Sequence, residues 1–286
     1  QDSVAAMFMI VFENVVNVAL NMFFVIYLGM KADGVALGTA IAGWSSLFFG
    51  LLLILLRHKK ALWKISLKLI FVLNKLTRVI SVNINIFLRS FSLLTVFSWF
   101  TYASKLYGND VLAVNTLLMQ FFMFFSFFID GFSYAGESLS GKYLGAGKLK
   151  MLKITVKILF KWAFWVSVIF SLLYFLGGKF MFKLLTDNDL LIQLAVEKQL
   201  WVILIPIVSF AAFVWDGIYA GTTHTAAMRN VMLIAVFGVF FPLYFLLENF
   251  MPQLSLWIAF ISFFIARSIG MTLARPKILR LRTNSV

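Results

Sequence analysis

Cysteine is absent from the sequence, and only two histidines are present, His58 and His224. Without cysteine the chain has no disulfide and no cysteine-ligated metal, and two histidines are too few for a histidine cluster. Charged residues are scarce as well, at 13% of the 286 positions, which is about half their share in an ordinary soluble domain. A disulfide-stapled fold is therefore excluded, and a soluble fold is disfavoured.

Long hydrophobic runs take the place of the missing charges. Hydrophobic residues make up 62% of the chain, and the mean hydropathy is +0.97. Runs of about 20 residues, the length of helix that crosses a bilayer, recur near residues 4–28, 34–56, 81–105, 111–136, 154–177, 199–220, 230–248 and 255–273. They predict an all-α, polytopic membrane protein with about eight transmembrane helices.

The few charges are mostly of one sign, with 25 lysines and arginines against 11 acidic residues. The basic residues gather in alternate loops, at residues 57–78, at residues 142–153 and in the tail after residue 274. By the positive-inside rule these loops face the cytoplasm, so we expect both ends of the chain there, with anionic lipid as a neighbour. No segment outside the spans is long enough to build a basic face for nucleic acid, so the bilayer is the expected partner.

Residues 58–80 form the long connection of the chain and predict a linker between two lobes. Hydrophobic residues recur along it at helical spacing while lysines occupy the other face, which is typical of an amphipathic helix at a membrane surface. We expect residues 1–57 to be the last two helices of a first lobe and residues 81–275 to be a complete six-helix second lobe. Residues 276–286 are then a basic cytoplasmic tail.

A weak internal similarity indicates that the first lobe is incomplete. Residues 1–7 resemble residues 223–229, and each stretch opens a hydrophobic span that leads through a hairpin into another. If the first two spans correspond to the last two, the first lobe lacks four helices that the second lobe has. We therefore expect twelve helices in the intact protein.

Amide side chains form a polar strip on the first span. Asn14, Asn17 and Asn21 are spaced three and four residues apart, so they share one helical face. Such a strip can line an aqueous cavity or coordinate a cation, or it can hydrogen-bond a neighbouring helix, and both interpretations stay open. Thr39 lies in the small-residue run 34–40 of the second span, for which close helix packing is the alternative explanation.

Four ionisable residues of the expected second lobe should lie at similar membrane depth: Arg89, Asp130, Glu137 and Asp216. A charged side chain in the bilayer costs about 2.5–3.5 kcal/mol on insertion scales, and pairing arginine with carboxylates offsets that cost. The four residues therefore predict a charge network with a structural or gating role. A protonatable coupling site within the network is the second interpretation.

Nearer the outer end of the fourth span, Asn115, Met119, Gln120 and Met123 are candidates for the wall of a substrate cavity. Methionine and aromatic side chains are adaptable, polarizable partners for bulky apolar cations. With 34 phenylalanines in the chain, ordinary packing against helices and lipid is the alternative. No catalytic motif or phosphate-binding loop accompanies these residues, so we do not expect an enzyme.

Several motifs resemble those of a known transporter family. The stretches 128–132 (FIDGF), 144–147 (LGAG) and 216–225 (DGIYAGTTHT) resemble the second lobe of the multidrug and toxic compound extrusion (MATE) family, in its DinF-like branch. The resemblance covers nearly the whole chain. It implies a two-lobe, twelve-helix antiporter of which this chain supplies helices five to twelve.

The resemblance also implies roles for three residues of the first lobe. Asn17, Asn21 and Thr39 match positions that take part in a proton or sodium site in the family. The family typically has aspartate where Asn21 stands, so Asn21 cannot itself carry the proton. The coupling ion, H+ or Na+, stays unassigned, and no other cofactor is expected.

The function implied is secondary active antiport. We expect a monomer in a bacterial inner membrane that exports amphipathic or cationic organic compounds by alternating access. A flippase for lipid-linked oligosaccharides is the alternative within transport. Its cavity should hold several basic residues to bind the pyrophosphate, and Arg89 is the single central basic residue expected here. A non-transporting truncated remnant is the alternative from another class.

Overall fold

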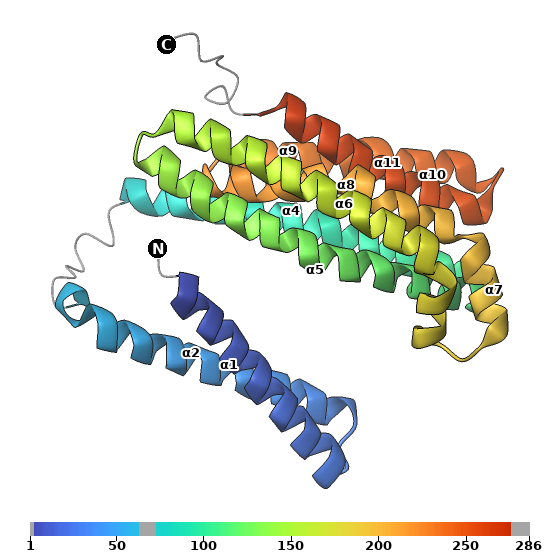
Figure 1. Cartoon of the computed structure of the whole chain (residues 1–286), viewed down its shortest axis with the longest axis horizontal. Helices are drawn as coiled ribbons and strands as arrows, with labels where there is room; N and C mark the ends of the chain where they lie inside the picture. Colours follow the sequence, from blue (N-terminus) through green and yellow to red (C-terminus); the bar gives the residue numbers. More distant parts are fainter. Residues whose placement is uncertain (1–2, 63–72, 276–286) are drawn as a thin grey trace. The chain divides into compact units, whose positions relative to one another are not determined.

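The computed structural model describes residues 3–62 and 73–275, and within these ranges every regular element is a helix (Figure 1). Eight of these helical stretches are long and apolar enough to cross a membrane. The prediction of an all-α, polytopic membrane fold with about eight spans is thereby confirmed for the described part of the chain.

The chain divides into two compact units, residues 1–76 and 77–286. The first unit is a helical hairpin. Helix α1 (Ser3–Met22) continues through a π-helical turn, η1 (Phe23–Tyr27), and helix α2 (Ala32–Leu62) runs back along it. Residues 63–72, the middle of the expected linker, lie outside the described residues.

Close approach of α1 and α2 depends on a glycine. A side chain at Gly38 of α2 would collide with the amide oxygen of Asn21 on α1. Further along the hairpin, the rings of Phe12 and Phe49 stack with their centroids 4.6 Å apart. The small-residue run 34–40 therefore does pack closely, at the depth where the amide strip lies.

The second unit is a bundle built from the rest of the chain. Its long helices are α4 (Leu73–Leu106), α5 (Asn109–Gly145) and α6 (Leu149–Leu185), followed by α8 (Gln199–Gly221) and α11 (Pro252–Leu273). The span between α8 and α11 is continuous but irregular, because a π-helical segment η2 (Ile234–Phe240) joins α9 (Thr225–Leu233) to α10 (Phe241–Glu248).

A short helix that was not expected from the sequence, α7 (Asp189–Glu197), connects α6 to α8. Its first turn is capped by Asn188, whose side-chain oxygen accepts hydrogen bonds from the backbone amides of Leu190 and Leu191. Ile192 and Ala195 bury its apolar face. Nine residues are too few to cross a bilayer, so α7 leaves the number of spans unchanged.

Helices α5 and α8 touch along their backbones, and two glycines of α8 make this possible. A side chain at Gly217 would collide with the carbonyl oxygen of Ser133, and one at Gly221 would collide with the carbonyl oxygen of Glu137. Small residues four apart let membrane helices approach in this way. The contact brings Asp216, next to Gly217, to the face of α8 that meets the acidic part of α5.

Candidate functional site

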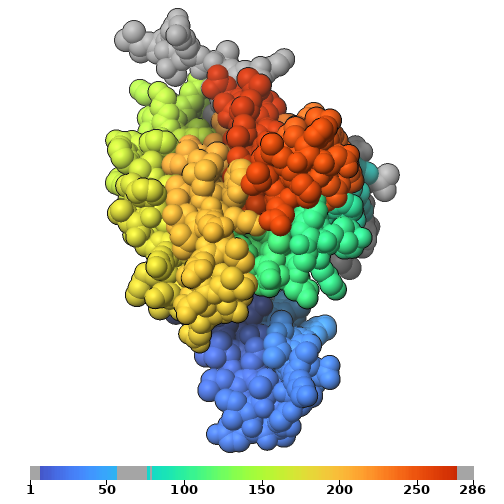
Figure 2. Space-filling view, turned by 90° about the vertical axis from the view of Figure 1, so that its right-hand side faces the viewer, coloured from blue at the N-terminus to red at the C-terminus, as the bar shows by residue number. Residues whose placement is uncertain are grey.

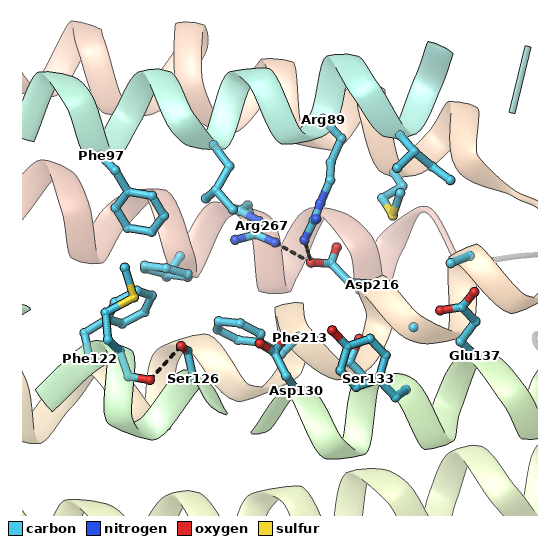
Figure 3. A pocket seen from close by; sticks show the side chains of 18 residues that line it. Arg89, Phe97, Phe122, Ser126, Asp130, Ser133, Glu137, Phe213, Asp216 and Arg267 are labelled. Atoms are coloured by element: carbon cyan, nitrogen blue, oxygen red, sulfur yellow. Dashed lines mark hydrogen bonds and ion pairs between the residues drawn. The ribbon is translucent and has the colours of Figure 1, made fainter. Parts of the chain in front are cut away.

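A cavity of about 470 Å³ lies inside the second unit, lined by residues of α4, α5, α8, α9 and α11 (Figure 3). One end is aromatic and the other carries the ionisable groups. Its charged lining residues are Arg89, Asp130, Glu137, Asp216 and Arg267. The four ionisable residues selected from the sequence thus come together around one space, joined by a fifth.

Asp216 is the centre of the charged end. Its Oδ2 atom accepts a hydrogen bond from Nη2 of Arg267 at 2.8 Å and a second from Nη2 of Arg89. Figure 3 shows the two arginines reaching the carboxylate from different helices. Because both use the same oxygen, Oδ1 of Asp216 is buried without a partner.

Arg267 was missed in the sequence, although its side chain is only 1% exposed. It projects from α11 and lies over the rings of Phe263 and Phe264, with Cζ 5.3 and 5.5 Å from their centroids. An arginine inside an apolar, 22-residue helix is a strong signal for an interior functional position. Applying that rule to every span would have found it.

Asp130 and Glu137 supply the remaining charges, both from α5. Asp130 is half-buried and Glu137 is exposed, and neither takes part in an ion pair with a described residue. Three carboxylates therefore face two arginines across the cavity. With all five groups ionised the lining carries one net negative charge.

The other end of the cavity is a set of aromatic rings with one methionine. Phe122 packs against Phe97, Phe213 and Phe264, with ring centroids 5.4 to 6.4 Å apart, and Met123 lies beside them in the lining. Such a surface can hold a flat apolar body of variable shape. The cavity thus combines a charged end with an adaptable apolar end.

Only part of the expected substrate wall lies on a cavity. Met123 lines the main cavity, and with Gln120 it also lines a smaller, mainly apolar one of about 280 Å³ between α5 and α6. Met119 packs against the core instead. Asn115 is 2% exposed and lines neither of these two cavities.

In this structure the amide of Asn115 bridges neighbouring helices in the core. It donates to Ser104 Oγ at 2.8 Å and accepts from Trp257 Nε1 at 3.0 Å. These bonds tie α4, α5 and α11 together. Nothing in the sequence distinguished such a buried bridging amide from one that faces a cavity.

In the first unit the three residues singled out by the family resemblance form one hydrogen-bonded chain. Asn21 donates to Asn17 at 2.9 Å, and Asn17 donates to Thr39 of α2 at 3.1 Å. Asn14 instead bonds the carbonyl of Ile10 in its own helix. The strip therefore links two helices through Asn17 and Thr39.

Within this set of hydrogen-bonded side chains, Asn21 Oδ1 has no partner among the described residues. The side-chain oxygen of Asn21 is buried and accepts no hydrogen bond, and it lies against Gly38. Within residues 3–62 and 73–275, no three acidic or histidine side chains come close enough together to hold a metal ion. A cation bound in the cavity of the second unit, or beside Asn21 in the first unit, would thus rely on amides, hydroxyls and at most two carboxylates.

Comparison with known proteins places these features in a family. The model of the family described as MatE matches residues 84–246. The chain is 31% identical over 276 residues to the DNA damage-inducible protein F of Escherichia coli (strain K12). The alignment covers 93% of this chain and 58% of that protein. The chain therefore spans less than two thirds of the length of this relative.

Solved structures of MATE transporters share the fold. A MATE structure in the straight conformation superposes with a TM-score of 0.84 at 16% identity, over 97% of this chain and 63% of the other. The Vibrio cholerae MATE transporter VcmN in the bent form gives 0.79 at 16% identity, over 98% of this chain and 63% of the other. At this level of identity the likeness concerns the fold.

Proposed function

Because the chain belongs to the MatE family, we propose that the protein is a secondary active antiporter that exports amphipathic or cationic organic compounds in exchange for H+ or Na+. The site is the cavity of the second unit. The observation that carries the proposal is the meeting of two unpaired carboxylates, Asp130 and Glu137, with an aromatic wall in one space.

Charge and shape favour a cationic amphiphile as the substrate. The net negative lining attracts a positive group toward Asp130 and Glu137, while Phe122 and its neighbours accept the apolar body. Asp216 bonds both Arg89 and Arg267 but offsets only one of their two positive charges. Asp130 and Glu137 outweigh the remaining one. The substrate is thus bound by charge at one end and by packing at the other.

Exchange follows when the substrate and the coupling ion compete for the same carboxylate. Asp130 has no described counter-ion, so a proton or Na+ can neutralise it in one state and a cationic substrate in the other. Binding that differs between two conformations is what drives an alternating-access cycle. Asn17, Asn21 and Thr39 are proposed as a second cation-handling position in the first unit.

A flippase for lipid-linked sugars is the weaker alternative. The structure corrects the count of central basic residues, because Arg267 joins Arg89 in the cavity lining. Two arginines would suit a pyrophosphate better than one, but both already bond Asp216, and the lining keeps a net negative charge. A dianionic headgroup is therefore disfavoured there.

The proposal is tested by transport in vesicles. The whole protein is reconstituted in liposomes, and efflux of a cationic dye is followed under an imposed pH or Na+ gradient. Gradient-dependent efflux that falls in Asp130→Asn supports the proposal. Absence of any dye movement under both gradients, in protein that is folded, would favour the non-transporting alternative.

A further inference from the structure

Helix α6 carries four lysines along one face: Lys150, Lys153, Lys157 and Lys161. Their spacing of three, four and four residues places them within a narrow arc of the helix. We call these four residues the lysine stripe. Lys150, Lys157 and Lys161 are exposed, and Lys153 is half-buried.

The stripe lacks acidic neighbours on its own helix. No aspartate or glutamate occurs anywhere in α6. No described carboxylate forms an ion pair with Lys150, Lys157 or Lys161. Like charges at this spacing repel one another, so an external anion would stabilise the face.

The apolar part of α6 fixes the depth of the stripe in the membrane. Residues 162–178 carry no charge, and they span about 26 Å of helix, close to the thickness of the hydrocarbon layer. Lys161 therefore lies at one hydrocarbon boundary and Lys179 at the other. Lys157 lies about 6 Å and Lys150 about 16 Å beyond the first boundary, so Lys157 and Lys161 share the depth of lipid headgroups.

The side chains next to the stripe suit lipid tails. Trp162 is 59% exposed, Trp165 is 51% exposed and Ile158 is 50% exposed. Tryptophan at this depth is typical of the membrane interface. Figure 2 shows lime to yellow surface of α6 at the left edge of the second unit. The exposed fractions of Trp162, Trp165 and Ile158 leave their face of the helix open to lipid.

We infer that the lysine stripe of α6 is a binding site for an anionic phospholipid in the leaflet that the α5–α6 turn faces. The phosphate lies between Lys157 and Lys161, and the acyl chains lie along Trp162 and Trp165. The site is separate from the transport cavity, because none of these residues lines it. It anchors the α5–α6 hairpin at a defined depth.

The test uses the whole protein in nanodiscs of phosphatidylcholine with increasing brominated phosphatidylglycerol, and it reads quenching of tryptophan fluorescence. Brominated phosphatidylcholine in place of brominated phosphatidylglycerol gives the reference for lipid without net charge. The variant is Lys157→Gln/Lys161→Gln. The matched control is Lys179→Gln/Lys183→Gln, which removes the same charge from the other end of the same helix.

We expect a preference for phosphatidylglycerol over phosphatidylcholine that falls roughly fivefold for each lysine removed from the stripe. The control variant should keep the preference, because it leaves Lys157 and Lys161 in place. Both leaflets contain the anionic lipid, so an equal site at the other end of α6 would show as a loss in the control. Lys157→Arg/Lys161→Arg should keep it too. The inference is overturned if the unaltered protein shows no preference, or if the two double Gln variants lose it equally.

Discussion

Arg267 and Asp216 form an ion pair at 2.8 Å between helices α11 and α8, and the arginine side chain is only 1% exposed. A buried arginine in an apolar helix is tolerated when a carboxylate and aromatic faces surround it, and Phe263 and Phe264 provide the latter. Arg89 adds a third helix, α4, to the same carboxylate. Asp216 therefore joins three helices at the charged end of the cavity.

Replacing Asp216 by asparagine should destabilise the protein and impair efflux. The change leaves the buried Arg267 and the half-buried Arg89 without their counter-charge, for which we expect a loss of about 3–5 kcal/mol of stability. Thermal unfolding of the purified protein measures it, with Asp110→Asn, an exposed residue at the start of α5, as the control. Unchanged thermal stability and unchanged transport would remove Asp216 from any central role.

Replacing Asp130 by asparagine should impair efflux without that loss of stability. Asp130 has no described ion pair to break, but the change removes a negative charge that substrate and coupling ion would share. We expect the gradient-driven efflux of a cationic dye to fall about tenfold, within the usual range of coupling energies. Full efflux in this variant, with normal folding, would contradict the proposed exchange at Asp130.

Gly217→Ala should weaken the contact between α8 and α5. The added methyl group meets the backbone of Ser133, which cannot move as a flexible side chain can, so we expect a loss of about 1–3 kcal/mol. The matched control is Gly131→Ala in α5, where nothing lies within 4 Å of the added atom. Equal melting temperatures for the two variants would argue against a backbone contact at Gly217.

The orientation of α6 can be tested directly, because the chain contains no cysteine. Single cysteines at Ala146 and Asp187, which are exposed beyond the two ends of α6, report opposite sides of the membrane. With the lysine-rich turn in the cytoplasm, an impermeant maleimide added to intact cells should label Asp187→Cys alone. Labelling of Ala146→Cys alone would reverse the proposed topology.

The spans could be predicted from the sequence because each depends on a local property, the length of an uninterrupted apolar run. Depth along the membrane is local too, so Arg89, Asp130, Glu137 and Asp216 could be selected as a group before any contact was known. The short helix α7 was missed because its nine residues give neither a spanning run nor a long periodic pattern.

The rotation of each helix about its axis could not be predicted from the sequence, because it depends on which neighbouring helices it packs against. Asn115 and Asp130 lie on the same helix with polar side chains in apolar surroundings, yet one bonds Trp257 in the core and the other faces the cavity. Their sequence context does not separate the two roles. The backbone contact at Gly217 and Gly221 contributes to the difference by setting how α8 meets α5.

The sequence by itself determined that the chain is helical, membrane-spanning and equipped with a few interior charges, since composition and spacing settle these properties. Only the tertiary structure decided that Arg89 and Arg267 share one oxygen of Asp216 while Asp130 forms no ion pair with a described residue. This arrangement of charges requires side chains from α4, α5, α8 and α11 to converge. Convergence is set by helix packing across long separations in the chain, which no local pattern encodes.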